Sequence, residues 1–156
     1  MARFLIMWIP FVLWFSVAAW GLELWEGYKI TTTEYYGLRN IGFAFLAIIV
    51  LAAIVLYVIA AGPLTIVLYR FIPYFPVRMF IYAIAGGASG VWVFRNMYND
   101  YFVRGYDLNM SSAILIFTAM GLAYAITDYW LQIQIRRKDG RWEFGNRDET
   151  IRNQGE

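Results

Sequence analysis

The sequence contains no cysteine and no histidine, and each absence excludes a class of chemistry. Without cysteine there is no disulfide bond, thiolate nucleophile, iron–sulfur cluster or cysteine-ligated zinc. Without histidine the chain lacks the usual general acid–base at neutral pH and the commonest transition-metal ligand. Ser-His-Asp and Cys-His catalysis and the usual zinc and copper sites are therefore excluded, while oxygen-ligand sites for magnesium or calcium stay open. We expect no catalytic residue, no resident metal and no cofactor.

Charge is also scarce, since only 15% of the residues are charged and 61% are hydrophobic. A soluble domain averages about 25% charged and about 45–50% apolar residues. The apolar residues are gathered in long stretches without a charge, which is typical of a membrane protein rather than of a large soluble core. Outside the tail there is no basic face with base-stacking aromatics, so we expect no nucleic-acid partner.

The predicted fold is all-α, an integral membrane bundle of about four transmembrane helices over residues 1–131, followed by a basic cytoplasmic tail over 132–156. The predicted spans cover residues 4–22, 41–62, 79–95 and 110–131. At about 1.5 Å per residue, such stretches cross a hydrocarbon core of about 30 Å.

Prolines and small residues complicate the ends of these spans. Ser16-Val17-Ala18 resembles a signal-peptidase site, so the first span is either a retained helix or a cleaved signal peptide. The bulky tryptophans of this span favour the retained helix. The second span either ends at Gly62-Pro63 or kinks there and continues toward Arg70. Two prolines in residues 69–78 predict a tight turn there.

The tail begins with alternating apolar residues, and Asp139-Gly140 is a turn signal. This pattern favours a short β-hairpin on the membrane surface, and a helix that continues out of the bilayer is an equal alternative. The basic cluster Arg136, Arg137 and Lys138 serves as a positive-inside signal, and it can also contact anionic lipid headgroups or a cytoplasmic partner.

Lysine and arginine are distributed unevenly between the two sides of a four-span protein. The side that holds the N-terminus, the 69–78 turn and the tail has nine, which are Arg3, Arg70, Arg78, Arg136, Arg137, Lys138, Arg141, Arg147 and Arg152. The opposite side has four, which are Lys29, Arg39, Arg95 and Arg104. Because an excess of these residues marks the cytoplasmic side, we expect both termini in the cytoplasm and favour a prokaryotic plasma or inner membrane.

The third span carries the strongest local motif, a set of small residues spaced four apart: Ala83, Gly86, Gly87, Ser89 and Gly90. Residues at this spacing share one helix face, and their small size lets two backbones approach closely. The face can pack within the bundle, against a membrane-protein partner or second copy, or along a substrate path. All three stay open at this point.

Asp128 is the single acidic residue within a predicted span, and an ionisable group there is a functional hypothesis by default. We expect a structural role, in which Asp128 snorkels or pairs with Arg70 or Arg78. Contact with a partner and proton or ion handling are the alternatives. We expect the carboxylates on the opposite side, Glu23 and Glu26 among them, to be solvated loop charges or members of ordinary salt bridges.

Three classes of function are compatible with these features. The favoured one is a non-catalytic accessory, assembly, immunity or regulatory subunit that acts through helix contacts in the bilayer. The second is an oligomeric small transporter, channel or holin-like pore, which the nearly non-polar centres of the spans disfavour. The third is a membrane enzyme that acts on a lipid-linked substrate with outer-side carboxylates and arginines.

Overall fold

The computed structural model describes residues 2–30, 43–98 and 100–153. Within these residues every regular element is a helix, and four segments are long and apolar enough to cross a membrane. The four are Ile6–Lys29, Leu46–Phe71, Phe75–Met97 and Met110–Gln134. The prediction of an all-α chain with four such helices is confirmed. Ile41 and Gly42, where we expected the second span to begin, lie outside the described residues, as does the rest of 31–42.

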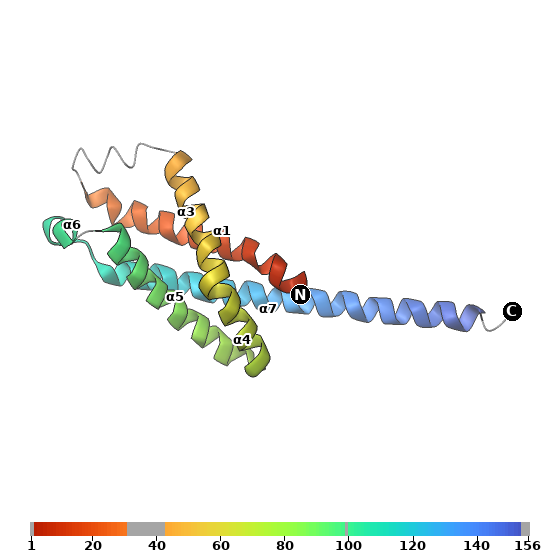
Figure 1. Ribbon diagram of the computed structural model, residues 1–156. Coiled ribbons are helices and arrows are strands. Elements are labelled where there is room, and N and C mark those ends of the chain that lie inside the picture. Colours follow the sequence, from red (N-terminus) through yellow and green to blue (C-terminus); the bar gives the residue numbers. More distant parts are fainter. Residues whose placement is uncertain (1, 31–42, 99, 154–156) are drawn as a thin grey trace.

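Helix α1 covers Ala2–Trp25 and is followed by a short 3₁₀ turn, η1, at Gly27–Lys29. Helix α5 covers Phe75–Met97 and α7 covers Met110–Asn153, with the short helix α6 (Asp100–Gly105) between them. The α5 and α7 helices pack along each other over the largest interface in the fold, and α1 lies against α7 and α3. Figure 1 shows α1, α5 and α7 side by side, with α3 and α4 crossing them obliquely.

The second span is one continuous helical segment with a wide turn in its middle. Helix α3 (Phe43–Leu56) passes through a π-helical turn, η2 (Tyr57–Ala61), into α4 (Gly62–Phe71). In this turn the Gly62 N–H donates to the carbonyl oxygen of Tyr57, five residues earlier. Pro63 has no N–H and its ring clashes with a regular α-helical turn, and the wider turn makes room for it. Of the two alternatives, the helix therefore continues past Gly62 rather than ending there.

The third span begins earlier than predicted. We expected residues 69–78 to form a turn, but the connection between α4 and α5 covers only residues 72–74. Pro76 lies in the first turn of α5, where a missing N–H breaks no helical hydrogen bond. Arg78 is consequently a helical residue, which places its side chain within the bundle.

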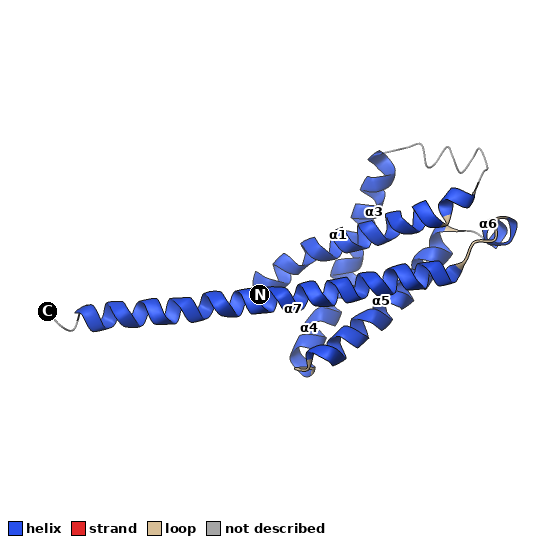
Figure 2. Cartoon of the chain, turned by 180° about the vertical axis from the view of Figure 1, so that it is seen from behind, coloured by secondary structure: helices blue, strands red, loops and turns tan. Residues whose placement is uncertain are grey.

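The β-hairpin alternative for the tail is wrong, since α7 continues as one helix to Asn153. Adding residues to an existing helix needs no new nucleation, which favours continuation over a separate hairpin. Figure 2 shows this extension projecting far beyond the rest of the chain. Residues 154–156, at the end of the tail, lie outside the described residues.

Candidate functional site

The α5–α7 interface depends on glycines whose missing side chains let the two backbones approach. A Cβ atom on Gly86 would overlap the carbonyl oxygen of Phe117, and one on Gly90 would lie 2.6 Å from that of Ala113. Reciprocally, a Cβ on Gly121 of α7 would overlap the carbonyl oxygen of Tyr82. The interface therefore uses small residues from both helices.

All five small residues predicted for helix packing lie on α5, and the structure divides them into two groups. Gly86, Gly87 and Gly90 are buried, whereas Ala83 and Ser89 are half-buried. The Ser89 hydroxyl donates a hydrogen bond of 2.7 Å to the carbonyl oxygen of Gly86. Because α7 of the same chain covers the three glycines, a partner helix would have to contact a different surface.

Asp128 is buried next to Arg78, with 3.7 Å between its Oδ2 and the Nη1 of the arginine. Only 5% of the Arg78 side chain and 2% of the Asp128 side chain are exposed, so neither reaches the interface by snorkelling. Gln132 Nε2 donates to Asp128 Oδ2 at 3.3 Å, and the guanidinium lies 5.9 Å from the centre of the Tyr69 ring. Of the two partners proposed for Asp128, the structure brings Arg78 to it.

A hydroxyl and aromatic cluster lies one helical turn further into the bundle from this ion pair. Tyr124 Oη and Thr65 Oγ1 are 3.2 Å apart and share a hydrogen bond. The Thr65 hydroxyl also donates to the carbonyl oxygen of Ala61, at 2.7 Å. The Tyr124 ring packs edge-on against Tyr82 and Phe11, with ring centroids 5.2 and 5.6 Å apart. The cluster thus joins α1, α4, α5 and α7.

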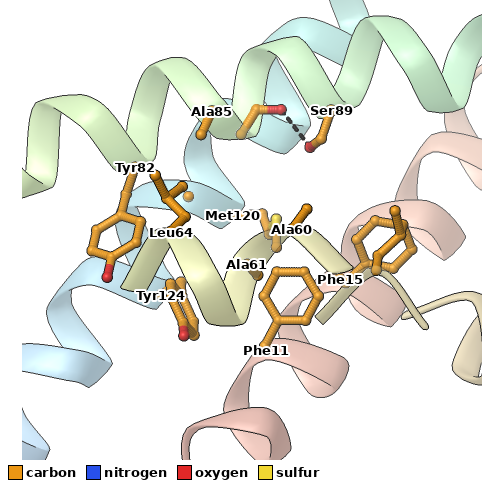
Figure 3. Close-up of a pocket in the computed structure, with 13 residues that line it drawn as sticks. Phe11, Phe15, Ala60, Ala61, Leu64, Tyr82, Ala85, Ser89, Met120 and Tyr124 are labelled. Atoms are coloured by element: carbon orange, nitrogen blue, oxygen red, sulfur yellow. Dashed lines mark hydrogen bonds between the residues drawn. The ribbon is translucent and has the colours of Figure 1, made fainter. Parts of the chain in front are cut away.

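Next to this cluster is a cavity of about 130 Å³, which we call the mid-span cavity. Its walls come from α1, from the α3–α4 segment, from α5 and from α7, and they are mainly aromatic, aliphatic or small. Figure 3 shows Phe11 and Phe15 facing it from α1, with Ala60, Ala85 and Met120 around it. The cavity is partly open to the outside of the bundle.

A second polar cluster lies at the opposite end of the bundle, and its burial was not predicted. Glu23 and Glu26 are 3% and 0% exposed. Tyr98 Oη donates to Glu23 Oε2 at 3.1 Å. Glu26 Oε2 accepts from Lys29 Nζ at 2.8 Å and from the backbone N–H of Asn109 at 3.1 Å. The prediction of an ordinary salt bridge is confirmed for Glu26, which pairs with Lys29. The prediction that these carboxylates are solvated loop charges is wrong for both Glu23 and Glu26.

These carboxylates could have been recognised in part from their spacing. Glu23 and Glu26 are three residues apart at the end of a helix, so they share a face that points at the neighbouring helices. Their partners Tyr98 and Asn109 are distant in sequence, and no local signal connects them. Among the described residues, no group of three or more potential metal-ligating side chains could hold a metal ion.

Arg136, Arg137 and Lys138 lie in the part of α7 that extends beyond the last candidate span. Their helical backbone is described, whereas their side chains lie outside the described residues. Contact of this cluster with lipid headgroups or with a partner therefore stays a prediction.

Comparisons with protein-family models, with curated proteins and with solved structures found no match for this chain.

Proposed function

We propose that the protein is a small multi-pass subunit of the cell membrane, with both termini in the cytoplasm. It is non-catalytic and acts as an accessory, assembly, immunity or regulatory subunit, through helix contacts in the bilayer. The orientation is supported by the nine lysines and arginines on the side of the N-terminus, against four on the other. In Figure 1 the start of α1, the α4–α5 turn and the extension of α7 lie toward the same end, as this orientation requires.

The observation that carries the proposal is the exposed surface of the second span. This span has the highest mean hydropathy of the four, 2.7, yet only 22% of it is buried, against 33–39% for the others. Helix α3 packs mainly on α1. Its other faces and η2 expose Leu46, Ile48, Leu51, Ile54, Val55, Val58 and Ile59. A surface this apolar and uncovered is available to a partner helix in the bilayer.

The extension of α7 supplies a second point of contact. The part of α7 that follows Gln134 is about 28 Å long, since an α-helix rises by about 1.5 Å per residue. A helix that leaves the membrane and continues this far offers a rigid surface to a cytoplasmic protein. The sequence places Arg136, Arg137 and Lys138 at its base, where anionic headgroups would hold it near the membrane.

The proposal is tested by purifying a tagged full chain at native expression in mild detergent and identifying co-purified proteins by mass spectrometry. We expect one stoichiometric partner, lost when Leu51→Trp or Val55→Trp adds bulk to the exposed face of α3. The matched control is Leu115→Trp, because Leu115 is 71% exposed on a different helix. A chain that purifies as a homo-oligomer without any partner would contradict the accessory role.

A second function, an oligomeric transporter, channel or pore, is favoured by the buried Arg78–Asp128 pair. Ionisable residues inside a membrane often mark ion or proton pathways. The pair lies beside the Tyr124–Thr65 hydroxyls, so polar groups continue into the bundle. Proton flux into vesicles that contain purified protein tests this function. Flux that is abolished by Asp128→Asn, with the protein still folded, would favour transport over the accessory role.

A further inference from the structure

The mid-span cavity lies at the depth of the hydrocarbon core if the four apolar helices cross a membrane. Each helix contributes a lining residue that is nine or more residues from either end of its candidate span, namely Phe15, Ala60, Ala85 and Met120. Nine residues of helix correspond to about 13 Å. At that depth neither headgroups nor bulk water are present, and lipid acyl chains surround the protein.

The lining of the cavity disfavours water as its occupant. An ordered water needs two to four polar partners, and cavities with apolar walls stay dry. Among the lining hydroxyls, those of Tyr124 and Ser89 already have hydrogen-bond partners, since Tyr124 bonds to Thr65 and Ser89 donates to Gly86. The remaining walls are aromatic rings, aliphatic side chains and the small residues of α5 and η2. The cavity is therefore suited to an apolar occupant.

Size excludes a helix from the cavity. A volume of about 130 Å³ is close to that of a protein cavity that accepts one benzene molecule, so it holds about six carbon atoms. A helix with its side chains is about 10 Å across and would not enter. An acyl chain is narrow enough to enter the partly open cavity while the rest of the lipid stays in the bilayer.

Segments η2 and α5, which both line the cavity, pack on different helices. Helices α4 and α5 are consecutive, but α5 packs along α7, whereas η2 and α4 contact α1. Two of the cavity walls, with Ala60 on η2 and Ala85 on α5, therefore belong to parts of the fold that pack on different neighbours. We propose that the acyl chain of a membrane lipid inserts between these walls and fills the mid-span cavity. This inference rests on the proposed membrane location.

The test uses purified full-length protein in phosphatidylcholine vesicles whose lipids carry a photoactivatable diazirine near the end of one acyl chain. After illumination, labelled residues are mapped by mass spectrometry. We expect label on Met120, which is only 7% exposed and is reached through the cavity. Ile59 is 70% exposed at similar depth, so ordinary surrounding lipid labels it in any membrane-inserted chain.

Ala85→Phe and Ala61→Phe each add a ring at a half-buried residue that lines the cavity, and should abolish the label on Met120 while Ile59 stays labelled. The matched control Ile84→Phe adds the same ring at a 57% exposed neighbour of Ala85 and should change neither label. Label on Ile59 without label on Met120 overturns the lipid site and leaves the membrane location standing. Label on Met120 that survives both filling variants also overturns the site. Absence of label from both residues overturns the membrane location itself.

Discussion

A methyl group added to a glycine of the α5–α7 interface measures how much the fold depends on backbone contact between these helices. In Gly86→Ala the methyl group would meet the carbonyl oxygen of Phe117, a backbone atom that cannot move without its helix. Overpacking of this kind costs about 1–3 kcal/mol, and a rigid obstacle puts Gly86 near the upper end. Alanine has a helix propensity about 1 kcal/mol better than glycine. We therefore expect a net destabilisation of about 2 kcal/mol.

Alanine variants of the other glycines should change the free energy of unfolding by graded amounts. A Cβ on Gly90 would lie 2.6 Å from the Ala113 carbonyl oxygen, so its variant should cost less than that of Gly86. A Cβ on Gly87 would lie 2.9 Å from the Thr118 hydroxyl, which can rotate away, so Gly87→Ala should be close to neutral. Gly21 on α1 has nothing within 4 Å, and Gly21→Ala should stabilise by about 0.5–1 kcal/mol.

Reversible unfolding of the purified protein in detergent micelles gives the free energies of this series. A double variant, Gly86→Ala with Gly121→Ala, should cost less than the sum of the two single variants, because the first methyl group already separates the helices. The reasoning is refuted if Gly86→Ala is as stable as Gly21→Ala, or if the destabilisation does not follow the order Gly86, Gly90, Gly87.

Two further predictions concern the buried polar contacts. Asp128→Leu should destabilise the protein by about 3–5 kcal/mol, because it leaves Arg78 buried without its countercharge. Arg78→Met combined with Asp128→Leu should recover most of this loss in the free energy of unfolding. Equal stability of the single and double variants in denaturant unfolding would contradict the ion pair. Tyr98→Phe should cost about 1–3 kcal/mol by removing the donor to the buried carboxylate of Glu23. Its control is Tyr101→Phe at a 72% exposed position, and a Tyr98 variant as stable as that control would show that the hydrogen bond contributes nothing.

Hydropathy was sufficient to predict the helices of this fold, because spans of this length and apolarity have no other way to satisfy their backbone in a membrane. The boundaries were less accurate where proline was concerned. Pro63 was interpreted as either the end of a helix or a kink in it, and Pro76 as part of a turn, but Pro63 is accommodated by a π turn and Pro76 lies in the first turn of α5. The error at Pro76 mattered more, because it assigned Arg78 to a turn and so concealed the position of this arginine inside the bundle.

The candidate sites were predictable to different degrees. The small-residue motif around Gly86 identified a close helix contact, but its spacing carries no information on whether the facing helix is α7 or a partner. Asp128 was found because a lone carboxylate in an apolar span stands out. The mid-span cavity could not be predicted from the sequence, because its walls come from four segments that are far apart in the chain.

The most direct test of the account is the side of the membrane on which each loop lies, and the absence of cysteine makes it simple. Single cysteines are introduced at Tyr28, Tyr74 and Tyr101, which are 70%, 72% and 72% exposed, and intact cells are treated with a membrane-impermeant maleimide. The account predicts that the cysteines at positions 28 and 101 react in intact cells, and that the one at position 74 reacts only after permeabilisation. Reaction of the cysteine at position 74 in intact cells, or protection of the other two, would contradict four spans with both termini in the cytoplasm.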